Sequence, residues 1–347
     1  METTQNVFAQ LSGQDDNLGD SELRVAYLDA LRGQGRHVHV FLATPTTDYS
    51  SRFSTTSDVT FYEDRVSWAR AMNATTRPVY AFNAGEINPR PGVFPGPRLV
   101  KEATRAVSNG GIVLATGIGI RNAQDVSSVK FDPAFRDAAV MSWRDQGSRD
   151  AAGFGGFAPD WAYSLGRATA DWAKPDERPL LAVTFRFDRP WPGDEWLSAV
   201  RAFARATSTR IVTVTQVARD SPRAVRLAEA LGGDYLEPPS MRHDALDEYV
   251  RAVYRQSLAV ISDRAHGLIM GASEGAYPIG SGSDPHKISR LLEAVGLGDL
   301  VGRYDQFGDF ALRFETHLPT LAPAVNVARA EIADLTARIR AAMDAVA

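Results

Sequence analysis

The sequence predicts an α/β protein of two doubly wound, Rossmann-like domains that face each other across a cleft. Three observations lead to this fold class. Short β-branched runs alternate with amphipathic segments, which is the pattern of βαβ units around a parallel sheet. The alternation occurs in both halves of the chain, with a polar, proline-containing segment between them. The length of 347 residues exceeds the usual size of one hydrophobic core, so two domains are expected.

The first half of the chain contains a predicted helix and four predicted strands. Residues 20–33, "DSELRVAYLDALRG", carry apolar side chains at helical spacing. The segments that separate the strands are longer and more polar than those of the second half, so we expect an α/β unit with larger insertions. Apolar runs bounded by polar residues predict the strands within 36–43, 77–85, 110–119 and 137–143.

The second half shows the alternation most regularly. Residues 221–233 predict a helix, because Ser221 can cap it, Pro222 suits its first turn and Gly232 suits its end. Residues 244–256 form a second amphipathic segment. Around these helices, β-branched runs predict strands within 178–186, 209–216 and 258–263.

A polar segment at residues 171–179, with prolines at its middle and its end, is the expected linker. We place an N-terminal α/β domain at residues 1–175 and a C-terminal α/β domain at residues 176–319. Residues 320–347 contain a long amphipathic helix beyond the last βα unit. We expect this helix to pack back on the N-terminal, acceptor-side domain.

Composition and charge exclude several classes of partner. The 38 basic and 42 acidic residues give a formal net charge of -4 with both signs interspersed, so we expect no nucleic-acid partner and no attraction to an anionic membrane. The absence of cysteine removes disulfides, thiolate nucleophiles and cysteine zinc sites. The first residues lack the regions of a signal peptide, and no later run approaches the roughly 20 apolar residues of a membrane span. A cytoplasmic location is the expectation.

The strongest candidate site follows the predicted strand that ends near residue 262. Open parallel sheets bind ligands outside the carboxyl ends of their strands, and a helix that begins there favours an anion through its free N–H groups. Arg264 adds a planar fork suited to a carboxylate or phosphate, and His266 can exchange a proton near neutral pH. The alternative is that Arg264 pairs with a neighbouring carboxylate and His266 caps the turn. We favour catalytic and donor-binding roles.

A glycine- and serine-containing loop after residues 276–280 is a second candidate for anion binding. Backbone N–H groups at Ser281 and Gly282 can hold an anion, and Lys287 would add a charge from the first turn of the next helix. The alternative is an ordinary βα turn with a solvated lysine. Arg186, at the end of another predicted strand, is a candidate for a further donor contact.

Asn17 and Asp20 precede the first predicted helix and admit two interpretations. Asn17 can cap the helix while Asp20 reciprocates at the third position, as in a capping box. Alternatively, the two side chains contact a hydroxylated acceptor. Both interpretations stay open at this point.

Three other motifs favour structural interpretations. The stretch "ATGIG" at residues 115–119 lacks the third glycine of a dinucleotide-binding fingerprint, so no nicotinamide cofactor is expected. His37 and His39 alternate on one strand face without a third ligand at suitable spacing, so no metal site is expected. In "SWRDQGS", an internal ion pair and a helix cap explain Arg144 and Asp145.

Several motifs together resemble the polysaccharide pyruvyl transferase family, whose members form ketals from phosphoenolpyruvate. The Arg-x-His element, with the downstream Lys and Leu-Leu, is the most specific of these motifs, and all of them run in the family's order along nearly the whole chain. The matching pieces are "NLGD" at 17–20, "SWRDQGS" at 142–148, "APDWAYSLG" at 158–166, "TQVARD" at 215–220, "SDRAHGLIMGASEG" at 262–275 and "HKISRLLEAVGL" at 286–297.

The resemblance implies a two-domain arrangement like that of the GT-B glycosyltransferases, with phosphoenolpyruvate as co-substrate and no further cofactor. It implies donor-site positions for Arg264 and His266, with assistance from Lys287 and Arg186. The chain departs from the family at Ala265, where a larger apolar residue is common. It also departs in its polar N-terminal segment, where a clean first strand is usual.

We therefore expect a transferase that joins pyruvate from phosphoenolpyruvate to two hydroxyls of one sugar, in a cell-surface glycan or its precursor, as a cyclic ketal with release of phosphate. His266 would transfer protons, and the acceptor would lie near Asn17 and Asp20. Two alternatives stay open: a nucleotide-sugar glycosyltransferase of the same architecture, and a non-catalytic sugar-binding protein. The acceptor itself stays open among a polymer, a lipid-linked precursor and a nucleotide-linked precursor.

Overall fold

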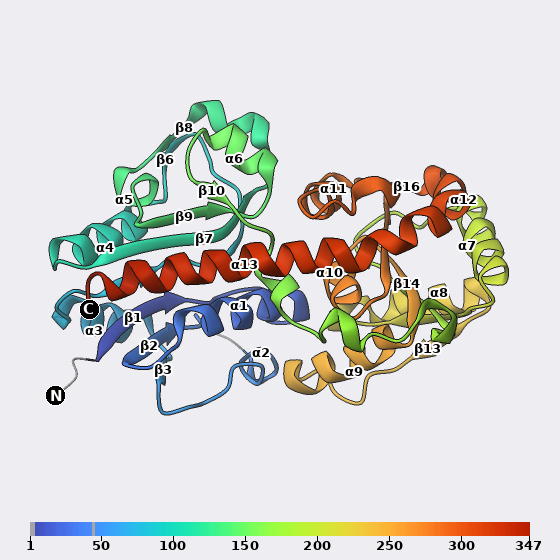
Figure 1. The fold of residues 1–347 in the computed structure, drawn as a ribbon, viewed down its shortest axis with the longest axis horizontal. Coiled ribbons are helices and arrows are strands. Elements are labelled where there is room, and N and C mark those ends of the chain that lie inside the picture. The colour runs from blue at the N-terminus through green and yellow to red at the C-terminus, as the bar shows by residue number, and fades with distance from the viewer. Residues whose placement is uncertain (1–3, 44–45) are drawn as a thin grey trace.

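The computed structural model describes residues 4–43 and 46–347, and two parallel α/β sheets dominate it (Figure 1). In the first sheet, the first strand of the chain lies in the interior, with the next two strands of the chain on one side of it and later strands on the other. Its spatial order is β10 (Gly156–Phe157), β9 (Val140–Trp143), β7 (Ile112–Ile120), β4 (Val79–Ala81), β1 (Gln5–Gln10), β2 (Arg36–Phe41) and β3 (Val59–Tyr62), with β5 (Gly85–Ile87) paired to the end of β7. A separate small sheet pairs β6 (Gly92–Phe94) with β8 (Val129–Phe131).

The second sheet contains the strands that the sequence predicts most regularly, and their presence confirms those predictions. All of its pairings are parallel. Its spatial order is β13 (Asp234–Leu236), β12 (Arg210–Val214), β11 (Leu180–Thr184), β14 (Ser257–Ser262), β15 (Tyr277–Gly282) and β16 (Val301–Arg303). Because the strands are parallel, their carboxyl ends form one edge of the sheet, where a ligand site is expected.

Helices cover the faces of both sheets and supply the connections between parallel strands. Those associated with the first sheet are α1 (Leu18–Leu31), α2 (Thr47–Ser50), α3 (Arg65–Ala74), α4 (Pro97–Ser108), α5 (Pro133–Arg136) and α6 (Gln146–Ala152). Those that follow β11 are α7 (Asp194–Ala206), α8 (Ser221–Leu231), α9 (His243–Arg255), α10 (Ala265–Ser273), α11 (His286–Glu293), α12 (Phe307–His317) and α13 (Leu321–Asp344).

β1 lies at the centre of the first sheet, in the N-terminal segment whose polar composition argues against a clean first strand. Residues 7–9 are fully buried, and the polar side chains that flank them have partners. Gln5 donates a hydrogen bond to a backbone carbonyl of α13, and Gln10 donates one to Glu102. These hydrogen bonds offset the free energy of burying polar side chains. The partners are distant in sequence, so the local sequence does not reveal them.

α8 illustrates how the helix signals work in this chain. Gly232 adopts the left-handed conformation that ends the helix, as the sequence predicts. Ser221 is the first helical residue rather than the cap, and the capping position belongs to Asp220. The Asp220 carboxylate does not cap the helix, because it accepts hydrogen bonds from Arg264 and from the Phe187 backbone.

α13 runs the length of the molecule past both sheets, as the red helix in Figure 1 shows. It contacts α1 and β9 near the first sheet and α10 near the second. Its buried side chains recur at helical spacing from Leu321 to Met343. The helix therefore ties the final segment of the chain to the N-terminal sheet.

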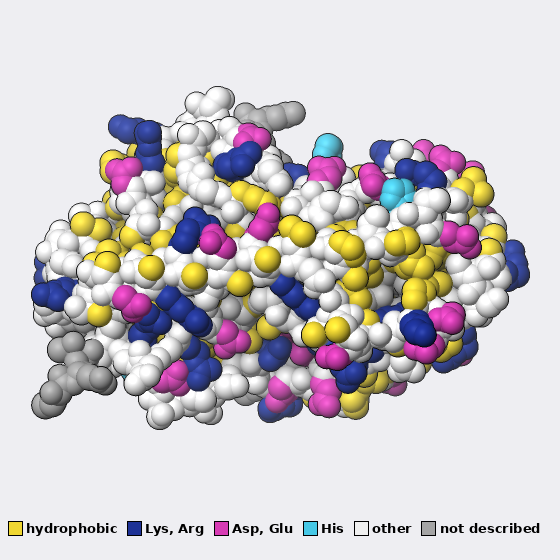
Figure 2. Space-filling view, in the orientation of Figure 1, with side chains coloured by type: hydrophobic (Ala, Val, Ile, Leu, Met, Phe, Trp, Pro, Cys, Tyr) yellow, Lys and Arg dark blue, Asp and Glu magenta, His cyan; other side chains and the backbone are white. Residues whose placement is uncertain are grey.

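Charged side chains of both signs are interspersed over the face of the molecule seen in Figure 2, as the composition suggests. None of the helices that the structure describes in residues 4–43 and 46–347 has the length and apolar character needed to cross a membrane.

Candidate functional site

The carboxyl edge of the second sheet meets the N-terminal end of α1. The Leu18 amide donates a hydrogen bond of 3.2 Å to the Gln216 carbonyl, and Asn17 forms an isolated antiparallel bridge with Val217. A Cβ atom added at Gly19 would lie 2.4 Å from Cβ of His266. Glycine at this position therefore allows α1 and α10 to approach closely, and it brings the two halves of the chain together at one site.

Arg264 lies at the capping position of α10, and only the Nε atom of its guanidinium group makes a hydrogen bond among the described residues. Its Nε donates to the Asp220 carboxylate, and its backbone amide donates to Ser262 Oγ at 2.8 Å. Within the described residues, its two terminal nitrogens have no hydrogen-bond partner. Arg264 can therefore pair with a carboxylate and bind an anion at the same time, because Nε contacts Asp220 while Nη1 and Nη2 remain available.

His266 lies in the first turn of α10 and faces a carboxylate of the other half of the chain. Its Nε2 is 3.6 Å from Oδ2 of Asp160, and about one tenth of its side chain is exposed. Asp160 also accepts hydrogen bonds from Arg144 and from the Ala162 amide. Burial opposes its ionisation, but the charges of His266 and Arg144 outweigh that effect and lower the pKa of Asp160. An ionised Asp160 therefore faces the imidazole, whose Nε2 is buried without a hydrogen-bond partner among the described residues.

Arg144 is a site residue that the sequence analysis assigned to a structural role. The predicted helix cap is present, because Asp145 accepts from the Ser148 amide at 2.8 Å and begins α6. The predicted internal ion pair is wrong: Arg144 Nη1 donates to Asp160 at 2.9 Å instead. Its Nε and Nη2 are buried without a hydrogen-bond partner among the described residues. Unpaired buried donors are costly, so an anion would satisfy them.

Lys287 and Arg290 of α11 reach across to the first sheet. Lys287 Nζ lies 3.2 Å from Oε2 of Glu86, a residue of β5, and Arg290 Nη2 lies 3.0 Å from Oε1. Burial opposes ionisation of Glu86, yet the charges of Lys287 and Arg144 more than offset it and lower the pKa of Glu86. Neither Glu86 nor Arg290 carries a local sequence signal, and both belong to the site only through the fold.

The two interpretations of Asn17 and Asp20 separate in the structure. Asn17 caps α1, because its side chain accepts from the Gly19 amide at 3.1 Å. Asp20 does not complete a capping box. It accepts from the Gln14 amide at 2.9 Å and lies 3.4 Å from Arg24. Burial opposes ionisation of Asp20, but the charges of Arg24 first, and then of His266 and Lys287, lower its pKa.

Of three further predicted donor residues, Arg186 and Gly282 lie against Asp263, the residue before Arg264, and Ser281 points elsewhere. The Arg186 guanidinium pairs with Asp188 at 2.6 Å, and its backbone amide, not its side chain, points to Asp263. The Ser281 hydroxyl accepts from the indole of Trp196 at 2.9 Å, on the core side of β15. Gly282 is buried at the end of β15.

Asp263 precedes Arg264 and was not singled out by the sequence. Its Oδ1 accepts from the Arg186 amide at 2.9 Å, whereas its Oδ2 is buried without a partner among the described residues. Burial raises the pKa of this carboxyl to about 6. A carboxyl that titrates near neutral pH therefore stands beside the free fork of Arg264.

His37 and His39, the two histidines of β2, contact other side chains. In the structure, His37 contacts the Thr60 hydroxyl, and His39 contacts the hydroxyl of Tyr62 and the side chain of Asn6. Across residues 4–43 and 46–347, no group of three or more His, Asp and Glu side chains could hold a metal ion.

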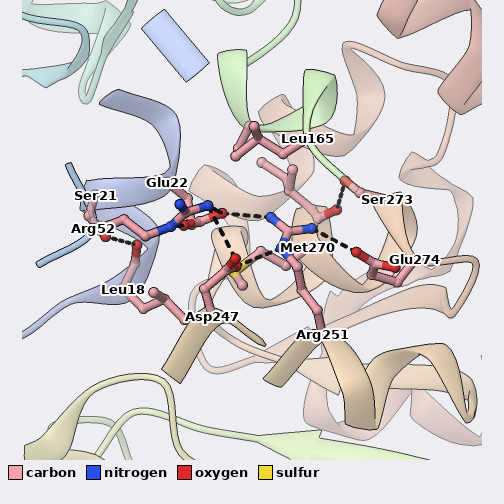
Figure 3. A network of polar contacts seen from close by, with 12 residues as sticks. Leu18, Ser21, Glu22, Arg52, Leu165, Asp247, Arg251, Met270, Ser273 and Glu274 are labelled. Carbon is pink, nitrogen blue, oxygen red and sulfur yellow. Dashed lines mark hydrogen bonds and ion pairs between the residues drawn. The ribbon is translucent and has the colours of Figure 1, made fainter. Parts of the chain in front are cut away.

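A buried ionic network joins α1 to α9 behind the site (Figure 3). Arg251 of α9 donates to Glu22 of α1 at 2.6 Å and to Glu274 at 3.1 Å. Arg52 also binds Glu22, and it lies 3.1 Å from Asp247. Burial, and then the charge of Glu22, raise the pKa of Asp247 to about 7. The network therefore holds the two halves of the chain in register.

Comparison with known proteins defines the fold class. No family model matches the sequence, and a search of the curated proteins finds no match either. Among solved structures, the chain is similar to HepE from Anabaena in complex with UDP, at 10% identity and a TM-score of 0.56 over 98% of this chain and 100% of that one. It is also similar to a UGT transferase from Siraitia grosvenorii in complex with UDP, at 9% identity and a TM-score of 0.54 over 99% of each chain.

An O-GlcNAc transferase mutant from Thermobaculum terrenum matches at 14% identity with a TM-score of 0.51, over 100% of this chain and 69% of that one. These similarities, together with the two parallel sheets, show that the chain has the GT-B fold. The predicted fold class is thereby confirmed. At these identities, the similarity describes architecture alone, and the reaction must be argued from the site.

Proposed function

We propose that this chain is a transferase that moves a group from a phosphate-bearing donor to a hydroxyl of a sugar, at the junction of α1 and α10. One observation carries the proposal. Arg144, whose Nε and Nη2 lack partners among the described residues, and His266 both face the Asp160 carboxylate, and Arg264 lies two residues before His266 at the carboxyl edge of the second sheet. Open guanidinium groups beside a residue that can exchange a proton suit an anionic donor.

The donor would lie at the N-terminal end of α10. The free fork of Arg264, the first amides of the helix and the Lys287 ammonium can all contact phosphate or carboxylate oxygens. Each charge-assisted hydrogen bond contributes about 1.5 to 3 kcal/mol. Asp220 fixes Arg264 through Nε, which leaves the fork aimed at the ligand.

His266 would transfer protons during the reaction. The Asp160 carboxylate lies 3.6 Å from Nε2 of the imidazole, and the close approach at Gly19 places the start of α1 beside the ring. A positioned proton donor or acceptor typically accelerates a reaction by about 10² to 10⁴. Asp20, an ionised carboxylate in the first turn of α1, would accept a hydrogen bond from the acceptor hydroxyl.

Two donor classes suit this arrangement. A nucleotide sugar is supported by the shared fold, since the Anabaena and Siraitia structures are complexes with UDP. In that reaction, the α10 end would hold the diphosphate, and an acceptor hydroxyl would displace it from the sugar carbon.

Phosphoenolpyruvate is the second donor class, and the site residues favour it. Arg264, His266 and Lys287 match the resemblance to polysaccharide pyruvyl transferases, and the charged groups are mostly buried, which suits a small anion. Protonation of the donor's methylene carbon leaves positive character at C2, where one sugar hydroxyl attacks. Loss of phosphate then lets the second hydroxyl add to C2 and close a cyclic ketal.

A donor panel tests the proposal. The protein is incubated with phosphoenolpyruvate or with UDP- and ADP-sugars, each in the presence of a set of glycosides, and products are followed by mass and by release of phosphate or nucleotide. Ketal formation with free phosphate supports pyruvyl transfer, and glycoside formation with free nucleotide supports glycosyl transfer. Binding without turnover of any donor would contradict both and leave a sugar-binding protein.

A further inference from the structure

The Glu86 carboxylate is surrounded by four cationic side chains. Lys287 and Arg290 approach from α11 at 3.2 and 3.0 Å. Arg121 lies 3.3 Å from Oε2, and Arg144 lies 4.0 Å from Oε1. One carboxylate thus serves as a common partner for cations from both sheets.

The backbone fixes Glu86 in this position. It is the middle residue of β5, opposite Gly119 of β7, and its side chain is 8% exposed. Two of its partners also bind other carboxylates, Arg144 binding Asp160 and Arg290 binding Asp145. Lys287 and Arg121 are different, because within the described residues Glu86 is the only ion-pair partner of each, and 43% of the Lys287 side chain and 60% of the Arg121 side chain are exposed.

We infer that Glu86 occupies the place of the donor's anionic group and competes with that group for Lys287 and Arg144, so that it sets the affinity of the site for an anion. The inference rests on the proposed function, which assigns Lys287 and Arg144 to the donor. The group that replaces Glu86 is a carboxylate or a phosphate, because these are the oxygen anions that guanidinium and ammonium groups bind with charge-assisted hydrogen bonds.

Electrostatics explains why the two anions exclude each other. A phosphate or carboxylate on Lys287 would come close to the Glu86 oxygens, and like charges at that distance repel. Exchange of one anion for the other keeps the cations paired and avoids leaving buried charge uncompensated. Donor binding therefore requires the Glu86 carboxylate to move away from Lys287.

Glu86→Gln tests this role, because the amide keeps the size and hydrogen bonding of the side chain but removes its charge. Calorimetric titration with inorganic phosphate, phosphoenolpyruvate and UDP compares the variant with the wild type. We expect the variant to bind at least one of these anions about fivefold more tightly, the size expected for one competing charge in a partly exposed cluster. A merely structural role predicts the opposite sign.

Two further variants make the outcome decisive. Glu102→Gln removes another carboxylate that pairs with an arginine in the same half of the chain, Arg65, and its anion affinity should match the wild type. Glu86→Asp keeps the charge needed for folding but shortens the reach to Lys287, so it should tighten anion binding by a smaller factor. It decides the question if the glutamine variant does not fold.

Unchanged or weaker anion binding in folded Glu86 variants would overturn the inference, and so would an absence of binding in both the wild type and the variants. The proposed function fails separately. Tighter phosphate binding by Glu86→Gln, with no donor turned over by any form of the protein, would leave the anion competition intact and remove the transferase. Donor turnover without tighter phosphate binding by Glu86→Gln would support the transferase and overturn the anion competition.

Discussion

At the level of single residues, the site depends on guanidinium groups that are only partly used. Arg264 is held through Nε and Arg144 through Nη1, so each keeps nitrogens that have no partner among the described residues. Burial of such donors costs free energy that a bound anion would recover. His266 faces Asp160 and packs against the start of α1 at Gly19. This arrangement makes separate roles for the arginine and the histidine testable.

Arg264→Lys and His266→Asn should impair activity in different ways. Lysine keeps the charge but loses the planar fork, so donor affinity should fall about tenfold while kcat changes less. Asparagine keeps hydrogen bonding but cannot transfer a proton, so kcat should fall by about 10² or more while donor affinity is retained. Calorimetry and turnover, with circular dichroism as a check of folding, separate the two. Normal kcat in folded His266→Asn would exclude the histidine from proton transfer.

Asp263 predicts a pH-dependent stability effect. Burial raises its folded pKa to about 6 from an ordinary value of 3.8, so the stability associated with its protonated form is present below the ordinary value and is lost as pH rises through about 6. Asp263→Asn removes this loss while keeping an acceptor for the Arg186 amide. The variant should gain about 1 to 3 kcal/mol over the wild type between about pH 4 and pH 8, measured by urea unfolding. A less stable variant at the higher pH would mean that the charge is favourable in the fold.

At the level of elements, the approach of α1 to α10 assembles the site. The N-terminal ends of both helices lie at the carboxyl edge of the second sheet, and Gly19 leaves the space that His266 occupies. Asn17 secures the start of α1 by capping it. The geometry of the site is therefore sensitive to the distance between these two helices.

Gly19→Ala should reduce turnover at least about tenfold, because its methyl group cannot occupy a point 2.4 Å from Cβ of His266 and one helix must shift. Stability should also fall, because overpacking typically costs about 1 to 3 kcal/mol, of which the helix preference of alanine over glycine offsets at most about 1 kcal/mol. Gly308→Ala is the matched control, because Gly308 lies in α12 with open space around it. Equal activity of the two variants would show that the close approach is not required.

Sequence patterns account well for some elements and poorly for others. β11, β12 and β14 are short, mostly apolar runs rich in β-branched residues and bounded by polar residues. This composition and length identify them as strands. β1 is obscured because Gln5 and Gln10 are polar, and only their tertiary partners allow their burial. Arg264, His266 and Lys287 could be found because ligands bind at strand ends. Glu86 and Asp160 could not, because distant segments alone give them partners.

At the level of the whole molecule, the two halves of the GT-B fold are joined on both sides of the site. Lys287 and Arg290 reach Glu86 on one side, and the network around Arg251 joins α1 to α9 on the other. In that network, Glu22 and Glu274 are almost completely buried, so their charges rely on arginine for compensation. Ion pairs on both sides of the site thus help to fix the position of one sheet relative to the other.

Arg251→Met should cost about 3 kcal/mol of folding stability, because it removes one of the cations that pair with two buried carboxylates and leaves Arg52 for Glu22 and Arg255, at 3.8 Å, for Glu274. Arg338→Met, which removes an exposed ion pair with Asp334 on α13, should cost less than about 1 kcal/mol. Urea unfolding of the two variants provides the comparison. Equal losses would mean that solvent or Arg52 replaces Arg251 in the network.

The central claim is that a phosphate-bearing donor binds between Arg264 of the second sheet and the residues of the first. A crystal structure of the protein soaked with phosphoenolpyruvate, and a second one with UDP, tests it most directly. The proposal predicts phosphate or carboxylate oxygens within hydrogen-bond distance of the Arg264 fork and of Lys287, with the Glu86 carboxylate displaced. An anion bound elsewhere, with Arg264 contacting only Asp220 and Lys287 still paired to Glu86, would contradict it.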